Sequence, residues 1–153
     1  MPTLLNHKHQ SICIIKNTNE LDMTQEEKEL LLIKDLCARL PYGVECKDDN
    51  TNVTGTLSQI GLHYNMCALD KDDGESEYCY IPNCKPYLFP LSSMTEEQEI
   101  EYDATFDTIV YDNGKKDSVM TYKSFDWLNA NHFDFRGLIP MRLANDATGL
   151  NIY

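Results

Sequence analysis

The segment from Lys123 to Met141, KSFDWLNANHFDFRGLIPM, constrains the fold more than any other part of the chain. It contains the only Trp of the protein (Trp127), three of its five Phe and one of its four His. Large aromatic rings bury far more surface than their number suggests, so we expect this segment to anchor the core. Ser124 suits the N-cap and Asp126 the first turn of a helix, which should end near His132.

An amphipathic helix is predicted at about Gln25–Arg39. Thr24 and Glu27 have the capping-box spacing T-x-x-E, in which the hydroxyl and the carboxylate each accept a hydrogen bond from a backbone N–H. Apolar residues then recur at helical spacing, and Pro41 with Gly43 ends the helix. The predicted apolar stripe consists of Leu30, Ile33, Leu36, Cys37 and Leu40.

Beyond this helix, the apolar periodicity changes to two. Acidic turns separate four predicted short strands, which fall within Val44–Cys46, Val53–His63, Tyr64–Leu69 and Tyr78–Ile81. Their connections are too short for the crossover helices that a parallel sheet needs, so the strands should pair antiparallel. The expected product is a small, strongly bent sheet, for which an SH3-like barrel is one arrangement.

The following part of the chain links this sheet to the aromatic segment. Pro82–Pro90 is predicted to be an extended connector, because three Pro fix its backbone. A second capping box, T-E-E-Q at 95–98, predicts a short helix, and an Asp-Asn-Gly turn between Thr105–Tyr111 and Ser118–Tyr122 predicts a hairpin. The sequence therefore predicts an α+β fold in which an N-terminal helix and a C-terminal helix–aromatic segment pack on the sheet.

With 153 residues, the chain is long enough for one domain with its own core, expected over residues 23–153. Residues 1–22 are weakly patterned, and we expect a loosely ordered extension or an added edge strand at Ser11–Ile15. The sequence has no apolar run of about 18 residues, and Met1–Lys16 lacks the features of a signal peptide. The six Cys are then expected to be reduced thiols in the cytoplasm.

The net charge of −12 is concentrated in residues 41–122, which carry −11 of it, whereas residues 123–153 are neutral. Because contacts with phosphates need Lys and Arg, this concentration of negative charge disfavours binding to DNA or anionic membranes. It is compatible with a basic partner surface, or with solubility alone, which is the more common role of such charge. The acidic candidates for binding are Asp70, Asp72, Asp73, Glu75, Glu96 and Glu97.

Four side chains that can bind zinc lie close together in the sequence: His63, Cys67, Cys79 and Cys84. Their spacing, H-x3-C-x11-C-x4-C, lacks the paired C-x-x-C of zinc knuckles, and a free Cys on a strand is usually a small core residue. We therefore expect no metal ion and no other cofactor.

A second candidate group consists of Trp127, His132, Asp134 and Arg136. A His beside a carboxylate can act as a general base, and an Arg can hold an anion. No Ser or Cys nucleophile lies near them in the sequence, and the chain has no Gly-rich phosphate loop. We favour a structural role, in which His132 caps the preceding helix and Arg136 pairs with Asp134 or a backbone carbonyl. A pocket lined by these side chains stays open, and no enzyme is predicted.

Four blocks of sequence carry a resemblance: LCARLPYGV (Leu36–Val44), KPYLFPLSSMTEEQ (Lys85–Gln98), SFDWLNANHFDFRGLIPM (Ser124–Met141) and the ending DATGLNIY. They resemble a family of small uncharacterised proteins of gut Bacteroides-type bacteria, their prophages and phages. The similarity runs from about Met23 onward. Such proteins usually begin near that residue, so this chain either has an extension or its start codon is placed early. The resemblance implies a phage or mobile-element origin but not a function, because the family has no catalytic assignment to carry over.

We therefore expect a non-enzymatic accessory protein of a phage or mobile element that binds a host macromolecule. An acidic inhibitor of host defence is the sharpest form of this hypothesis. Its partner would be a host protein with a basic surface, with no direct binding of nucleic acid or membrane. The alternative is a protein that sequesters a small nucleotide signal, whose phosphates backbone amides would have to hold. The nine Tyr could line a binding surface of either kind or simply form sheet.

Overall fold

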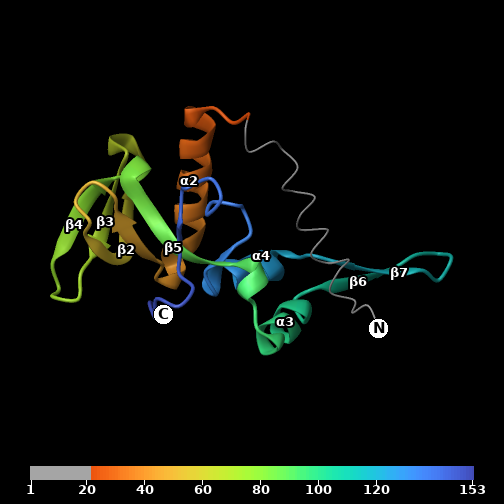
Figure 1. Cartoon of the computed structure of the whole chain (residues 1–153). Helices are drawn as coiled ribbons and strands as arrows, with labels where there is room; N and C mark the ends of the chain where they lie inside the picture. The colour runs from red at the N-terminus through yellow and green to blue at the C-terminus, as the bar shows by residue number, and fades with distance from the viewer. Residues whose placement is uncertain (1–21) are drawn as a thin grey trace.

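The computed structural model describes residues 22–153 and has the predicted α+β architecture (Figure 1). Helix α2 (Gln25–Arg39) packs against a bent, mostly antiparallel sheet, and helix α4 (Tyr122–Ala130) follows in the C-terminal part. The sequence predicts a loose extension or an edge strand at Ser11–Ile15 within residues 1–22. The structure describes only Asp22 of this range, so these predictions lie outside the described residues.

Five strands form an antiparallel run in the order β4-β3-β2-β1-β5. The fifth strand in the sequence, β5, pairs with the first, β1. A short 3-10 turn, η4 (Ile81–Asn83), precedes β5. A bulge between Leu57 and Gln59 bends the second strand. The strand bounds are β1 Glu45–Asp48, β2 Thr54–Gly61, β3 Met66–Asp70, β4 Ser76–Tyr80 and β5 Cys84–Pro90.

Strand β5 occupies most of the stretch that was predicted to be an unpaired connector. The extended backbone that Pro imposes is also that of a strand, and β1 supplies the pairing partner. On its other side β5 pairs in parallel with two very short strands, β8 (Phe133–Asp134) and β9 (Asn145–Asp146). Two-residue strands leave no periodic pattern, so the sequence did not indicate them.

Helix α3 (Glu96–Asp103) begins at the second capping box, as predicted. The predicted hairpin, β6 (Asp107–Val110) with β7 (Lys116–Val119), forms a separate two-stranded sheet that projects from the rest of the molecule (Figure 1). The N-cap predicted for α4 is wrong: Thr121 is the cap, and the Ser124 hydroxyl accepts a hydrogen bond from the Thr121 N–H (3.1 Å). Asp126 consequently lies outside the first turn.

Helix α4 also ends earlier than predicted, at Ala130. His132 has a φ of 60°, in the left-handed region that a right-handed helix cannot include. The chain therefore turns sharply before β8.

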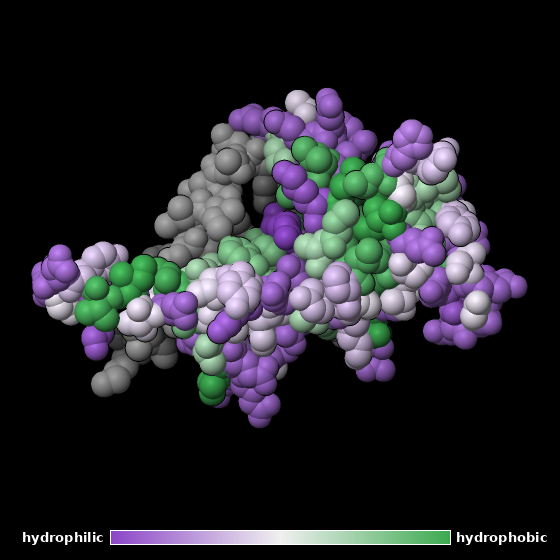
Figure 2. All heavy atoms as spheres, turned by 180° about the vertical axis from the view of Figure 1, so that it is seen from behind, coloured by the Kyte–Doolittle hydropathy of each residue, from purple (hydrophilic) through white to green (hydrophobic). Residues whose placement is uncertain are grey.

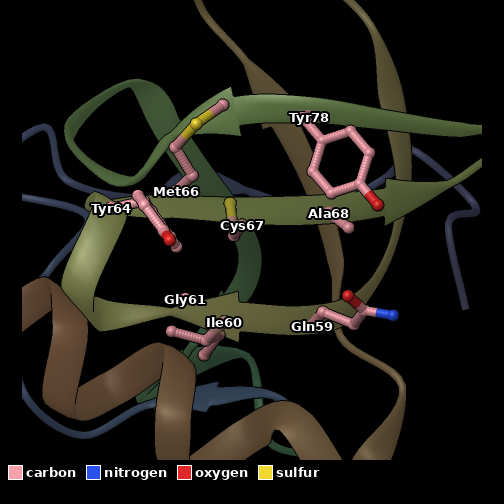
Figure 3. Close-up of a pocket in the computed structure, with 8 residues that line it drawn as sticks. All are labelled: Gln59, Ile60, Gly61, Tyr64, Met66, Cys67, Ala68 and Tyr78. Atoms are coloured by element: carbon pink, nitrogen blue, oxygen red, sulfur yellow. The ribbon is translucent and has the colours of Figure 1, made fainter.

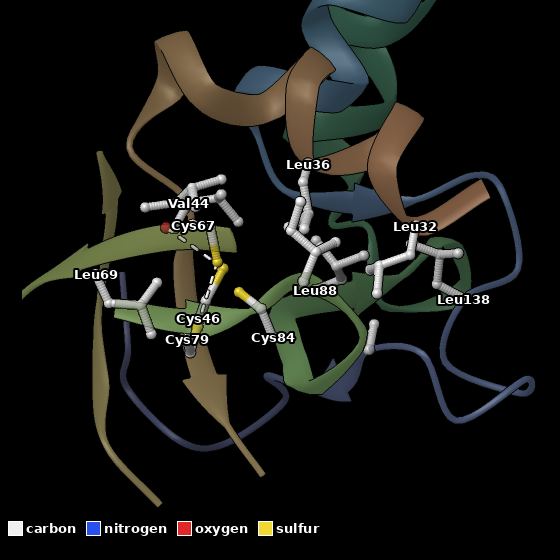
Figure 4. Packing of buried hydrophobic residues seen from close by; sticks show 13 residues of the cluster. Leu32, Leu36, Val44, Cys46, Cys67, Leu69, Cys79, Cys84, Leu88 and Leu138 are labelled. Carbon is white, nitrogen blue, oxygen red and sulfur yellow. Dashed lines mark hydrogen bonds between the residues drawn. The ribbon is translucent and has the colours of Figure 1, made fainter. Parts of the chain in front are cut away.

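The buried side of α2 differs from the predicted stripe. Leu32 and Leu36 are buried, whereas Leu30 is 51% exposed and Cys37 is exposed. The same helical side carries Asp35 and Arg39, and both side chains are fully buried because they pair with each other. Figure 4 shows Leu32 and Leu36 pointing from the helix into the core.

The described residues contain two clusters of buried apolar side chains. The larger lies between α2 and the five-stranded sheet. The second is built around α4 and the aromatic segment, with Leu128 and Phe133 buried and Trp127 partly buried at its margin. The aromatic segment thus anchors one of the two clusters.

Candidate functional site

A shallow apolar groove crosses the outer face of strands β2, β3 and β4. Strand alternation turns Cys67, Leu69 and Cys79 into the core, and it turns Met66 and Tyr78 outward. The groove has a volume of about 300 Å³. Its lining residues are Gln59, Ile60, Gly61, Tyr64, Met66, Cys67, Ala68 and Tyr78 (Figure 3).

Large side chains border the groove and small ones form its floor. Ala68 lies opposite both Tyr78 and Gln59 in the sheet, and it is only 1% exposed although it faces outward. Tyr78 is 63% exposed, and Tyr64, from the 3-10 turn η3 (Leu62–Tyr64), is 73% exposed. Figure 3 shows these two rings standing apart, with Cys67 between their positions and Ala68 close to Tyr78. Both rings are therefore largely open to a partner, apart from the side of Tyr64 that packs with His63.

Asp70 continues the same face next to this groove. It ends β3 opposite Ser76, and its carboxylate accepts hydrogen bonds from the hydroxyls of Ser76 (2.6 Å) and Ser58 (2.9 Å). These two bonds, that of Ser76 first, lower the pKa of Asp70. An exposed, ionised carboxylate thus lies on the sheet face that carries the tyrosines.

The other acids of the β3–β4 turn extend this negative end. The Asp73 carboxylate accepts the backbone N–H of Glu75 (2.9 Å), which lowers its pKa, and Lys71 pairs with both Glu75 and Asp73. Asp72 is exposed in the same turn. Four of the six acidic candidates, Asp70, Asp72, Asp73 and Glu75, therefore lie together.

The remaining two acidic candidates lie elsewhere. Glu96 and Glu97 occupy the first turn of α3, where they complement the helix dipole. In Figure 1 this helix is on the opposite side of the molecule from the β3–β4 turn. The six acids therefore occupy two separate surfaces.

A second surface with exposed apolar side chains is the projecting hairpin. Val110 is 61% exposed, and Ile109 and Tyr111 are also exposed. Figure 2, seen from behind, shows hydrophobic side chains on this hairpin at the left of the view. A two-stranded hairpin gains little stability by itself in water.

Trp127, His132, Asp134 and Arg136 have structural contacts. Trp127 stacks on Phe133 with the ring centroids 5.6 Å apart. The Asp134 carboxylate accepts the backbone N–H groups of residues 138 and 139, both at 2.8 Å. Arg136 does not pair with Asp134 as expected, because its guanidinium donates to the Asp35 carboxylate at 2.7 Å.

His132 is buried and stacks on the ring of Tyr153, with centroids 3.8 Å apart. It lies beyond the C-cap of α4, which is Asn131. Burial, with the charge of Arg39 as a smaller contribution, lowers the pKa of His132 to about 4. Its Nδ1 has no hydrogen-bond partner within residues 22–153, so no carboxylate orients it as a general base.

Sequence reasoning missed the buried ion pairs of α2. Arg39 donates to Asp35 at 2.8 Å and to the carbonyl oxygen of Phe133 at 2.7 Å. Asp35 also accepts from Arg136, so one carboxylate faces two guanidinium groups. The i,i+4 spacing of Asp35 and Arg39 is the only local indication, and it is equally typical of a surface pair.

The zinc ligands considered from the sequence do not all meet. His63 is exposed and packs edge-on against Tyr64. Within the part of the chain that the structure describes, the one group of potential metal ligands is Cys67, Cys79 and Cys84, whose sulfur atoms lie within 4.8 Å of one another. These thiols are buried.

No helix within residues 22–153 combines the length and the apolar character needed to cross a membrane. The chain matches no family model, and comparisons with curated proteins and with solved structures return no significant match.

Proposed function

We propose that the protein is a non-enzymatic accessory protein that binds a basic segment of a partner protein through the outer face of β2, β3 and β4. The observation that carries this proposal is the joining of an open tyrosine groove to the acidic β3–β4 turn on one sheet face. The partner class that the resemblance favours is a host protein in the cytoplasm, and inhibition of a host defence is the sharpest version of the role.

The chemistry of this face suits a Lys or Arg side chain. A cation is attracted to the face of an aromatic ring, and Tyr64 and Tyr78 each leave a ring largely exposed. The carboxylates of Asp70 and Glu75 supply the opposite charge close by. The two rings stand apart across the groove, and the alkyl stem of such a side chain would lie between them.

The nucleotide alternative fits this groove less well. None of its lining residues is Lys or Arg, and the neighbouring turn has four acids against the one cation of Lys71. Phosphate groups would be repelled by this charge. The volume of about 300 Å³ is also at the lower limit for ligand pockets of about 300–1,000 Å³.

The proposal can be tested with two variants that change the net charge equally. Asp72→Lys with Glu75→Lys reverses charge beside the groove, and Glu96→Lys with Glu97→Lys reverses it on α3. Fluorescence anisotropy would measure the binding of labelled Lys- and Arg-rich peptides, with an acidic peptide set as control. Tyr78→Ala removes one ring without changing charge.

The basic peptides should bind the wild type and the α3 variant alike, and should lose at least tenfold in affinity for the groove variant and for Tyr78→Ala. Equal losses of affinity in both charge variants would show that binding depends on net charge alone, and would refute binding at the groove. Native mass spectrometry of protein captured from a host-type lysate gives an independent readout. A bound mass of a few hundred daltons, retained in both charge variants, would support the nucleotide alternative instead.

A further inference from the structure

Four cysteines from four different strands converge inside the sheet. Cys46 lies on β1, Cys67 on β3, Cys79 on β4 and Cys84 on β5, and each is at most 3% exposed. The sulfur atoms of Cys67 and Cys79 are 3.3 Å apart, and that of Cys84 lies within 4.8 Å of both. Figure 4 shows these side chains pointing toward one another in the core.

Cys46 stands next to this group of three. In the β1–β5 ladder Asp48 is opposite Cys84 and Cys46 is opposite Pro86, which makes Cys46 and Cys84 diagonal neighbours. Figure 4 shows the two side chains as near neighbours in the core. The Cys46 sulfur does not lie within 4.8 Å of all three others, so it would have to shift toward the ion to become the fourth ligand.

The spacing of the sulfurs is that of a thiolate metal site. Four sulfurs at about 2.3 Å from a tetrahedral zinc ion lie roughly 3.8 Å from one another. The observed separations, from 3.3 Å to at most 4.8 Å among the three central sulfurs, bracket this value. An all-sulfur tetrahedral set selects zinc or iron–sulfur chemistry over the hard cations.

A disulfide between Cys67 and Cys79 fits their place in the sheet poorly. The Lys71 N–H donates to the Glu75 carbonyl at 2.8 Å, and the register runs unbroken from that pair to Cys67 opposite Cys79. In an antiparallel ladder every second pair of opposite residues is hydrogen-bonded, so Cys67 and Cys79 form such a pair. The Cα atoms of a hydrogen-bonded pair are about 5.5 Å apart, and their side chains stand farther apart than those of the alternate pairs. A disulfide also has Cα atoms about 5.5–6 Å apart, but it needs Cβ atoms only about 3.8 Å apart, so the two cysteines would have to tilt toward each other to form one.

We propose that Cys67, Cys79 and Cys84, with Cys46 as the fourth ligand, bind one zinc ion in the core of the sheet. Binding is a ligand exchange in which each thiol that ligates the metal releases its proton to solvent, so no oxidant or reductant takes part. The ion would join β1, β3, β4 and β5 from inside. The ion would lie on the inner side of these strands, whereas Tyr64 and Tyr78 stand on the outer side; Cys67 is the one residue that both lines the groove and belongs to the proposed metal site.

The test uses a background variant, Cys13→Ser with Cys37→Ser, which leaves only the four converging cysteines. The protein would be unfolded with a chelator and reductant, refolded with Zn²⁺ or Co²⁺, and freed of excess metal. Elemental analysis then gives the metal content, and absorption spectroscopy shows whether thiolate-to-cobalt charge-transfer and tetrahedral d–d bands develop. Adding Cys84→Ser to the background removes one central ligand.

The expected result is one metal ion per chain in the wild type and in the background variant, with cobalt bands of an all-thiolate site. Addition of Cys84→Ser should lower zinc affinity at least a hundredfold. If that variant does not fold, the metal content and the cobalt spectrum of the background variant decide the test. Less than a tenth of an equivalent of metal and no charge-transfer band would overturn the proposal. A Cys67–Cys79 disulfide, seen as a mass loss of 2 Da after mild oxidation of zinc-treated protein, would also overturn it.

Discussion

Protonation of His132 should make the protein less stable as the pH falls from about 6.5 to about 4. Burial beside Arg39 lowers the pKa of this imidazole to about 4 in the folded state, against about 6.5 in an unfolded chain. Between these values the unfolded state binds a proton that the folded state does not, so acid favours unfolding. The difference of about 2.5 units corresponds to roughly 3 kcal/mol at pH 4, and the loss should be absent above pH 7.

The measurement is urea unfolding at several pH values, followed by the fluorescence of Trp127. His132→Asn provides the comparison, because Asn tolerates the φ of 60° that this position requires. Burial raises the pKa of Asp134, so its protonation acts in the opposite direction, but both proteins share this effect. The unfolding free energy of the wild type minus that of the variant should fall by about 3 kcal/mol between pH 7 and pH 4. A difference that does not change with pH would show that His132 is not held neutral in the fold.

Four further substitutions test the packing. Asp35→Asn should lower the free energy of unfolding, measured in urea, by roughly 3–5 kcal/mol, because it leaves the Arg39 guanidinium buried without its ionised partner. A loss below about 1 kcal/mol would show that the pair is hydrated. Gly55→Ala should lower the melting temperature, since a Cβ there would meet the Asp70 carbonyl oxygen at 2.6 Å, whereas Gly61→Ala meets its nearest atom at 3.5 Å and should change little. Equal melting temperatures for the two glycine variants would contradict this. Trp127→Ala should lower the free energy of unfolding by about 2–3 kcal/mol, which is less than the loss for a fully buried ring, because Trp127 is only partly buried. A melting temperature equal to that of the wild type would refute its packing on Phe133.

The elements with local determinants could be predicted from the sequence. Thr24 and Glu27 begin α2 and Thr95 and Gln98 begin α3 as the capping boxes indicated, because a cap is decided within four residues. The hairpin at Asn113 follows from its turn in the same way.

The parts that depend on distant partners could not be predicted. Asp35 and Arg39 on the buried side of α2 pair with each other, and partners about 100 residues later, the Arg136 guanidinium and the Phe133 carbonyl oxygen, complete their contacts. In the same way, Cys46 lies far from the other core thiols in the sequence and meets them because β1 pairs with β5. The outer groove is likewise a product of strand register.

The parallel pairing of β5 with β8 and β9 has a consequence for biosynthesis. A ribosome extends the chain at roughly 5–20 residues per second, so β5 leaves the tunnel seconds before Phe133 and Asn145 exist to pair with it. During that time this edge of β5 is without β8 and β9, and Arg39 is without the Phe133 carbonyl. This edge of β5 should therefore stay unpaired until the residues of β8 and β9 have emerged, and chains truncated before Phe133 should be the forms that chaperones and proteases engage.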